Sequence, residues 1–332
     1  MTAIGTPIGQ PGGGSNTAAR RWRRRDFTFD RISFFLVFLI VPVVAYIVFV
    51  VSPFVQAAYY SLTDWSGFTP GMHFIGFGNY VKAFTDNIFM TAVGNSTLLA
   101  IVLPFVTIVL ALILASLVTV GGPSHGAIRG LRNSSFYRVV SFFPYVIPAI
   151  VIGIMWSQVY APNGILNGLL TGMGLHGFNS FAWLGEQATA MPATMFVIVW
   201  GLVGFYMVLF IAAIKGVPAE IYEAARIDGA GRLRTAVTIT IPLIRDNIQT
   251  SYIYMGILAL DAFVYMAALN PGGGPNNSTL VMSQQLFTTA FTKGQFGYAC
   301  AMGVILAAIT LLFAAIVFMV NRLTGGSNDV AE

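Results

Sequence analysis

Residues 192–214 read PATMFVIVWGLVGFYMVLFIAAI, and residues 215–245 continue as KGVPAEIYEAARIDGAGRLRTAVTITIPLIR. The first stretch has no charged side chain, and at about 1.5 Å per residue it is long enough to cross a hydrocarbon core about 30 Å thick. The second stretch holds five cations and three anions. An uncharged apolar helix that runs directly into a charged loop is typical of a membrane span that ends at the water interface. This junction therefore predicts a membrane protein.

The composition of the whole chain leads to the same prediction. Of 332 residues, 56% are hydrophobic and only 9% are charged, against roughly 25% charged in ordinary soluble domains. The two soluble domains that the length alone would suggest are therefore excluded. Six apolar segments are long enough to span a bilayer, at about 32–59, 90–120, 139–160, 192–214, 248–269 and 298–320. The sequence predicts an all-α membrane protein with six transmembrane helices.

The positions of the charges predict the topology. All but two of the 17 Lys and Arg residues lie before the first span, after the last span, or in the second and fourth loops, and the exceptions are Lys82 and Lys293. Cytoplasmic segments are enriched in Lys and Arg, so we expect both termini in the cytoplasm. Residues 1–31 are expected to form a disordered basic cytoplasmic tail that contacts anionic lipid. Residues 32–322 are expected to form the transmembrane domain, and residues 323–332 a cytoplasmic C-terminal tail. The net charge of +5 then belongs to the cytoplasmic face and does not indicate nucleic-acid binding.

Residue usage excludes several chemistries. Cys300 is the only cysteine, and the three histidines, His73, His125 and His176, lie far apart without the spacing of metal ligands. The sequence has no Gly-x-x-x-x-Gly-Lys-Ser/Thr motif and so lacks a P-loop for ATP. We expect no metal, cofactor or catalytic residue in this chain. The energy for any transport must come from another polypeptide or from an ion gradient.

The fourth loop contains a predicted short helix. Pro218 suits its first turn, Glu220 and Glu223 lie near its positive N-terminal end, and Gly229 ends it because glycine adopts a positive φ at little cost. Such a helix on the cytoplasmic side suits docking into a groove on a partner protein. An amphipathic helix lying among the lipid headgroups has the same pattern. The residues by themselves leave both interpretations open.

The same loop resembles a known signature. Glu223-Ala224-Ala225, three residues, Gly229, nine residues, Ile239, one residue and Ile241-Pro242 match the EAA motif of ABC-importer permeases, with Ile241 where that motif has leucine. The resemblance implies a coupling helix that fits a cleft on an ATP-binding subunit. The coupling residues it implies are Glu220, Glu223, Ala224, Ala225, Asp228 and Gly229.

Further stretches resemble the carbohydrate-uptake branch of these permeases, which is maltose-type and binding-protein-dependent. They are Ile227 to Ala230 in the fourth loop, Gly272-Gly273-Gly274-Pro275, Thr279, Ala290-Phe291 and Phe296-Gly297-Tyr298-Ala299 between the last two spans, and Asn95-Ser96-Thr97 in the second span. The likeness covers roughly 32–322, with the core of the family's domain at about 88–322. It implies the type I transmembrane-domain fold of ABC importers.

The resemblance also implies a setting and partners. The chain would be a multi-pass protein of the bacterial inner membrane, would form half of a translocation pathway, and would pair with a second permease subunit as a heterodimer. Two ATP-binding subunits would hold ATP and Mg, so this chain would not itself be an enzyme. An extracytoplasmic binding protein would deliver the substrate.

One ionisable side chain lies inside a predicted span. Asp261 is in the fifth predicted span, where placing a carboxylate costs at least about 2.5 kcal/mol. Because of this cost, an acidic residue inside a span is interpreted first as a functional residue. Tyr254, Asp261 and Tyr265 are spaced by seven and four and are predicted to share one helix face. A carboxylate and aromatic rings suit a sugar, so these residues and Asn95 are the candidate substrate pathway. The alternative is that Asp261 lies near water at the outer end and the tyrosines belong to an interfacial belt.

The hypothesis is thus a permease subunit of an ATP-driven importer for a sugar or oligosaccharide. An ABC permease for another solute, such as glycerol phosphate or a polyamine, is the first alternative. No Arg or Lys is visible inside a span, which disfavours a phosphate-bearing substrate. A transporter driven by an ion gradient usually carries internal repeats or paired intramembrane charges, and neither is visible.

Overall fold

The computed structural model describes residues 33–119 and 134–323. The predicted tail at 1–31, His125, Arg129 and Arg132 of the second loop, and residues 324–332 lie outside this part of the chain. The chain divides into two units, Met1–Pro53 and Phe54–Glu332, and each is described by itself. The elements are helical throughout the described residues, where the one β-bridge is an isolated pair between Thr63 and Phe74. The all-α prediction is confirmed.

The first predicted span is a helix from Ser33 to Tyr60. It consists of η1 (Leu36–Ile40), α2 (Val41–Tyr46), η2 (Ile47–Val51) and α3 (Ser52–Tyr60), of which η1 and η2 are π-helical turns. Each π turn ends two residues before a proline, Pro42 or Pro53. Proline lacks an N–H and its ring crowds the carbonyl one turn back, and a wider turn relieves that clash. The apolar side chains of residues 33–53 are largely exposed, as in Phe49 at 76%.

Three further long helices cross the second unit. They are α5 (Asn87–Thr119), α9 (Gln187–Lys215) and α16 (Phe296–Leu323), and each is apolar enough to span a bilayer. They match the second, fourth and sixth predicted spans. Proline lies inside α5 at Pro104 and inside α9 at Pro192, and neither interrupts its helix.

The third and fifth predicted spans are broken helices. The third consists of α6 (Ser134–Val146) and α7 (Ala149–Val159), bent by 96°, and the fifth of α13 (Arg245–Leu260) and α14 (Phe263–Leu269), bent by 48°. Counting each bent pair as one span gives the six that the sequence predicts. The two bends do not change the number of spans, which agrees with the prediction. Pro148, at the N-cap of α7, explains the first break because its fixed φ and missing N–H end the preceding helix.

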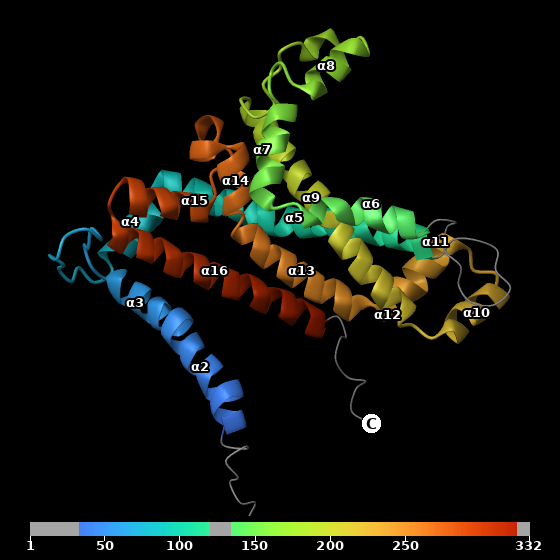
Figure 1. Cartoon of the computed structure of the whole chain (residues 1–332), viewed down its shortest axis with the longest axis horizontal. Coiled ribbons are helices and arrows are strands. Elements are labelled where there is room, and N and C mark those ends of the chain that lie inside the picture. The colour runs from blue at the N-terminus through green and yellow to red at the C-terminus, as the bar shows by residue number, and fades with distance from the viewer. Residues whose placement is uncertain (1–32, 120–133, 324–332) are drawn as a thin grey trace, which may run out of the picture. The chain divides into compact units, whose positions relative to one another are not determined.

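The interior of the second unit lies where α5, α9 and α13 pack together, with α6 against α9 and α16 along α13 (Figure 1). Leu99, Leu103, Val197, Met207 and Met255 are fully buried there. Small residues allow the helices to approach closely. A Cβ at Gly204 of α9 would overlap the carbonyl group of Ser141 in α6.

Short elements connect the outer ends of the spans. They are α4 (Gly78–Thr85), α8 (Ile165–Gly172), η3 (His176–Phe178), η5 (Pro271–Gly273), η6 (Pro275–Asn277), α15 (Met282–Phe287) and η7 (Thr288–Thr292). The segment with α8 is held by buried Asn167, which donates to Pro162 O at 3.0 Å and to Phe181 O at 2.8 Å. Its Oδ1 accepts a hydrogen bond from Trp183 Nε1 at 2.7 Å.

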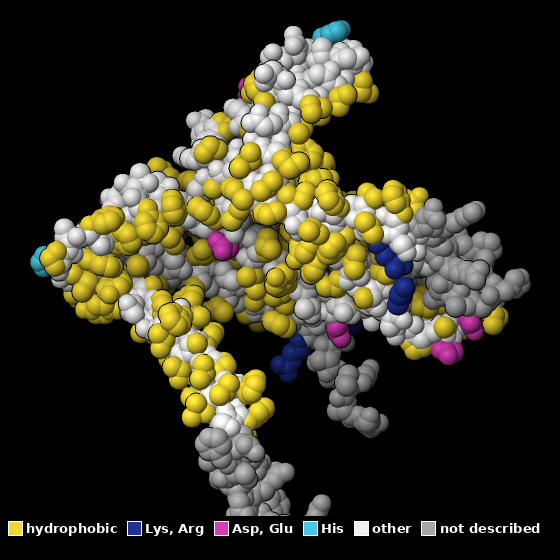
Figure 2. Space-filling view, in the orientation of Figure 1, with side chains coloured by type: hydrophobic (Ala, Val, Ile, Leu, Met, Phe, Trp, Pro, Cys, Tyr) yellow, Lys and Arg dark blue, Asp and Glu magenta, His cyan; other side chains and the backbone are white. Residues whose placement is uncertain are grey.

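The opposite ends of α9 and α13 are joined by four helical pieces, α10 (Ala219–Ile227), α11 (Arg232–Thr235), η4 (Ala236–Thr240) and α12 (Ile241–Leu243). Hydrophobic side chains cover most of the face of the second unit seen in Figure 2, and acidic and basic side chains gather toward the end that holds α10 and α12. This distribution fits a bilayer around the spans and water at the predicted cytoplasmic end.

Candidate functional site: a coupling helix and a cavity at two helix breaks

The boundaries of α10 follow from its own sequence. Pro218 is the N-cap, with φ −52°, one position before the first turn where the sequence placed it, and Glu220 lies in the first turn. At the other end Gly229 has φ +72°, its N–H donates to Arg226 O, and the N–H of Ala230 donates to Ala225 O at 2.9 Å. These two bonds form a Schellman cap, which satisfies the last carbonyls of a helix. The short helix predicted in the fourth loop is confirmed.

Two faces of α10 differ in burial. Tyr222 and Ala225 are 3% and 5% exposed, and the Tyr222 hydroxyl lies 3.3 Å from Thr240 Oγ1 of η4. The other coupling residues that the motif implies are exposed, and they are Glu220, Glu223, Ala224, Asp228 and Gly229. Of the six coupling residues that the motif implies, Ala225 therefore packs against its own chain. The other five are available to a partner.

The exposed face of α10 favours one of the two interpretations left open by the sequence. The exposed side chains of α10 include three carboxylates and one guanidinium, that of Arg226, and anionic lipid headgroups at the cytoplasmic leaflet would repel their net negative charge. Ile227, between these acids, is 86% exposed. An exposed isoleucine framed by acids suits a complementary protein groove better than a membrane surface.

A second candidate site is a cavity of about 400 Å³ between the two broken spans. Its wall takes residues from the end of α6 and the start of α7, from α9, and from both sides of the break between α13 and α14. This volume is in the range of small-ligand pockets. Interrupted membrane helices bind substrates because their freed backbone groups and side chains face a common space.

Asp261 lies in the break itself. It follows the last residue of α13, it is exposed, and it is the one acidic or basic residue among those that line the cavity. Tyr265 of α14 and Tyr145 of α6 line the same cavity. The Tyr145 ring stacks on Phe205 of α9, with centroids 4.6 Å apart. One carboxylate and two tyrosines can accept and donate hydrogen bonds and offer aromatic faces to a sugar ring.

The predicted shared face of Tyr254, Asp261 and Tyr265 is wrong. Because the helix ends at Leu260 and restarts at Phe263, the seven-and-four spacing does not run along one helix. Asp261 and Tyr265 come together in the cavity, whereas Tyr254 is 61% exposed and does not line it.

Asn95 also lies away from the cavity. Its Nδ2 donates to Asn277 O at 3.0 Å and to Leu280 O at 2.9 Å. The hydroxyl of the next residue, Ser96, accepts the N–H of Met282 at 3.0 Å. These bonds fix the outer loop that follows α14, in which Gly272, Gly273 and Gly274 all have positive φ.

Tyr145 is the residue that reasoning from the sequence missed. It lies between Pro144 and Pro148, and two prolines four residues apart predict an irregular helix. That signal could have marked residues 144–148 as the wall of a site. Within the described residues no group of three or more His, Cys, Asp or Glu side chains could hold a metal ion.

Comparison with known proteins places the chain among transport components. Residues 127–325, more than half of the chain, match the family model described as "Binding-protein-dependent transport system inner membrane component". The diacetylchitobiose uptake system permease protein NgcF of Streptomyces coelicolor is 64% identical over 313 residues, which are 94% of this chain and 89% of that protein. The multiple sugar-binding transport system permease protein MsmF of Streptococcus mutans is 34% identical over 272 residues, 82% of this chain and 89% of that one.

Solved structures agree on the fold. A bacterial ABC transporter involved in the import of the acidic polysaccharide alginate superposes with a TM-score of 0.74 at 20% identity, covering 89% of this chain and 98% of that one. The predicted importer fold is thus confirmed, and so is the predicted family. The chain belongs to the family of binding-protein-dependent transport system inner membrane components: it is a multi-pass permease subunit of an ABC importer, is not an enzyme and binds no cofactor itself.

Proposed function

We propose that this permease carries diacetylchitobiose, a disaccharide of N-acetylglucosamine, across the inner membrane. The observation that carries the proposal is the 64% identity, over 94% of the chain, to a permease named for uptake of that sugar. Relatives at lower identity are named for other sugars, as MsmF is for multiple sugars. The substrate class is therefore sugar, and the disaccharide is its finer assignment.

The cavity beside Asp261 supports a neutral sugar. No Lys or Arg lines it, so a phosphate-bearing solute would find no counter-ion there. The Asp261 carboxylate can accept hydrogen bonds from sugar hydroxyls and from the acetamido N–H. The rings of Tyr145 and Tyr265 can pack against the apolar face of a pyranose. In the proposed pathway these three residues bind substrate weakly while it passes. Tyr254 takes no part in it, and Asn95 holds the outer loop.

The partners are proposed from the family's organisation. A second permease subunit supplies the other half of the pathway, two ATP-binding subunits dock on the cytoplasmic side, and an extracytoplasmic protein delivers the sugar. A solved alginate importer described in complex with a pentasaccharide-bound periplasmic protein, superposing at a TM-score of 0.72, supports this arrangement.

The proposed mechanism links the two sites. Glu220, Glu223 and Asp228 on the exposed face of α10 engage the ATP-binding subunit. ATP binding closes the two ATP-binding subunits and moves α10. Tyr222 and Ala225 transmit that movement because they pack α10 against its own chain. The helices α9 and α13 then shift, and the breaks beside Asp261 let the outer parts of the spans move separately.

The test is transport by the whole complex. The permease pair, the ATP-binding subunits and the binding protein are reconstituted in proteoliposomes, and ATP-dependent uptake of labelled diacetylchitobiose is measured. Excess unlabelled diacetylchitobiose should abolish uptake, and maltose should not compete. If maltose competes equally, or if uptake requires an ion gradient in place of ATP, the proposal is wrong.

A further inference from the structure

The run of helical pieces that follows the coupling helix contains a π turn, η4. It covers Ala236–Thr240, and the N–H of Ile241 donates to Ala236 O, five residues back. Pro242 follows directly and has no N–H to continue an ordinary helical ladder. Single π turns are rare and are frequently found at functional sites. The two sides of this turn are held in different ways.

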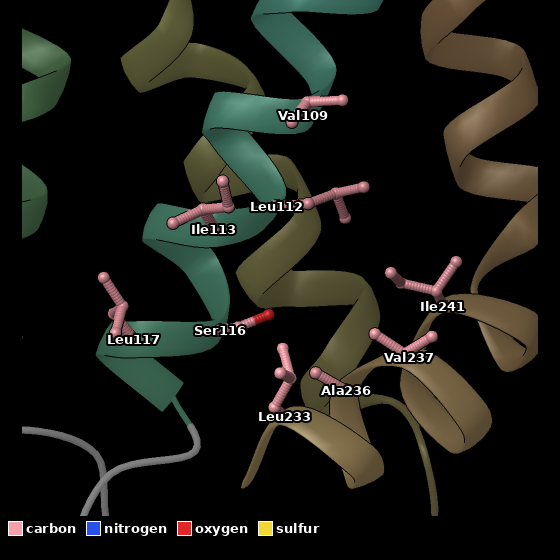
Figure 3. Close-up of a pocket in the computed structure, with 9 residues that line it drawn as sticks. All are labelled: Val109, Leu112, Ile113, Ser116, Leu117, Leu233, Ala236, Val237 and Ile241. Atoms are coloured by element: carbon pink, nitrogen blue, oxygen red, sulfur yellow. The ribbon is translucent and has the colours of Figure 1, made fainter.

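One side of the turn is apolar and open. Figure 3 shows Val237 and Ile241 facing Leu112 and Ser116 of α5 across a groove, whose volume is about 360 Å³. The Ser116 hydroxyl is the one polar side-chain group among the nine residues that line this groove. Val237 is 54% exposed. The position of the turn is therefore not set by polar contacts across the groove.

The other side of the turn is buried and hydrogen-bonded. Thr240 and Tyr222 of α10 are both almost fully buried. The Thr240 hydroxyl donates to Thr235 O at 3.3 Å, and it lies 3.3 Å from the Tyr222 hydroxyl. Because the single hydroxyl hydrogen of Thr240 is directed to Thr235 O, the Tyr222 hydroxyl is the donor to Thr240. This contact joins the coupling helix to the π turn.

The backbone of Thr240 continues the connection to α13. Thr240 O accepts the N–H of Ile244 at 3.1 Å. Ile244 is buried and is the N-cap residue of α13. Thr240 is therefore bonded to α10 through its side chain and to the start of α13 through its carbonyl. Connected hydrogen bonds and packed side chains of this kind can carry energetic coupling between sites.

We propose that Thr240 is a positioning residue of the coupling step. Its hydroxyl holds the π turn against Tyr222 of α10, and its carbonyl holds the N-cap of α13, so that α13 follows a movement of α10. The inference rests on the proposed coupling role of α10, and it does not depend on which sugar is carried.

The test measures how much sugar the complete reconstituted transporter carries per ATP hydrolysed, with the sugar that the wild-type complex carries. Tyr222→Phe and Thr240→Val each remove one hydroxyl with little change of shape, and each should lower this ratio about threefold. That factor corresponds to one net hydrogen bond at the weaker end of its range, because both bonds are longer than the usual 2.7–2.8 Å. Thr240→Ser keeps the hydroxyl and should retain the wild-type ratio.

A double variant and a control make the test specific. Tyr222→Phe combined with Thr240→Val should give the same ratio as Thr240→Val alone, because both changes remove the same contact. Thr238→Val is the matched control, since Thr238 lies in the same turn, is exposed, and donates to Arg234 O within the run at 2.7 Å. Its ratio should equal that of wild type. The melting temperature and the co-purification of partner subunits are recorded for every variant.

Several results would overturn the proposal. They are a wild-type ratio in both Tyr222→Phe and Thr240→Val, losses that multiply in the double variant, and an equal loss in Thr238→Val. Dissociation of the complex in either hydroxyl variant would assign the pair to assembly instead. Glu223→Lys separates this inference from the coupling role of α10. If Glu223→Lys uncouples transport and the hydroxyl variants do not, the role of Thr240 alone is refuted, whereas wild-type behaviour of Glu223→Lys refutes the coupling role itself.

Discussion

The coupling helix α10 and the cavity beside Asp261 are specified by the sequence in different ways. The limits of α10 are set within one short stretch, by Pro218 at one end and Gly229 at the other. The cavity takes its wall from five helices that come together only in the folded chain. A local motif can therefore be found by its spacing, whereas the cavity depends on how helices break and pack. The predictions below begin with these two regions and then turn to the loops outside them.

The largest effect is expected at α10. Glu223→Lys reverses a charge on the exposed face, and Gly229→Asp places a side chain at φ +72°, where L residues are strained. Each should lower transport and substrate-stimulated ATPase activity by about a hundredfold, near the upper range of coupling energies between sites. The measurement is ATPase activity of the reconstituted complex with and without binding protein and sugar. Glu186→Lys, an exposed charge reversal before α9, is the control. Wild-type activity in the Glu223 and Gly229 variants would refute the coupling role.

The next effect concerns packing that shapes the cavity. Gly204→Ala would push α9 from α6, because the added Cβ overlaps the Ser141 carbonyl. Overpacking of this kind costs about 1–3 kcal/mol and should lower the thermal stability of the purified complex. Gly94→Ala in α5 meets no atom within 4 Å and is the matched control. Equal melting temperatures for the two variants would contradict the close approach of α6 and α9.

Asp261→Asn tests the cavity chemistry while keeping its shape. Hydrogen bonds to a carboxylate are about twice as strong as those to a neutral amide, so uptake should fall about tenfold with assembly unchanged. Tyr145→Ala should lower uptake similarly, and Tyr254→Ala should not, because Tyr254 lies outside the cavity. Uptake of labelled sugar and co-purification of the partner subunits are measured together. Loss of assembly in Asp261→Asn would mark a structural role instead.

A smaller effect is expected at the outer loop. Asn95→Ala removes two hydrogen bonds, to Asn277 O and Leu280 O, and should destabilise the loop by about 1–2 kcal/mol. Faster hydrogen exchange at residues 270–281 is the readout. Thr97→Ala, whose hydroxyl bonds only to Val93 within α5, is the control. Unchanged exchange in Asn95→Ala would show that the loop is held by other contacts.

The smallest effect is expected in the loop between the first span and α4. The backbone N–H of His73 donates to Asp64 Oδ1 at 2.7 Å, and this bond holds the pKa of the Asp64 carboxyl below its ordinary value of 3.8. Because the pKa of Asp64 is lower in the folded loop, the ionised carboxylate stabilises the loop at pH values above the ordinary pKa. This stabilisation is lost as the pH falls through the pKa of the folded state. Exchange rates at residues 64–75, corrected for intrinsic pH dependence, should be constant from pH 7 to 5 and rise below about pH 4. Asp64→Asn should remove that rise.

Much of the fold could be predicted from the sequence because its signals are local. The length of each apolar run predicted the spans, and Pro218 and Gly229 predicted the limits of α10, for which the EAA spacing implied the coupling role. The breaks at Pro148 and Asp261 could not be placed from the sequence. Proline does not always break a helix, since α5 continues through Pro104, and the break at Asp261 contains no proline. The neighbourhood of Tyr145 and Asp261 depends on those breaks. The break after Leu260 is also why the predicted shared face of Tyr254 and Asp261 is wrong. Asn95 could not be recognised as an anchor of the outer loop, because its partners Asn277 and Leu280 lie far from it in the sequence.

The unbroken helix α13 has a mechanical consequence. It starts at Arg245, at the end of the segment that leads from α10, and it ends at Leu260, directly before Asp261. It is therefore a lever of 16 residues, about 24 Å long. A tilt of about 5° at its cytoplasmic end would carry the Asp261 carboxylate about 2 Å, enough to lengthen a hydrogen bond of about 2.8 Å beyond its useful range. In the proposed pathway, a slight rotation at the cytoplasmic end of α13 would therefore carry Asp261 out of hydrogen-bonding range of a sugar.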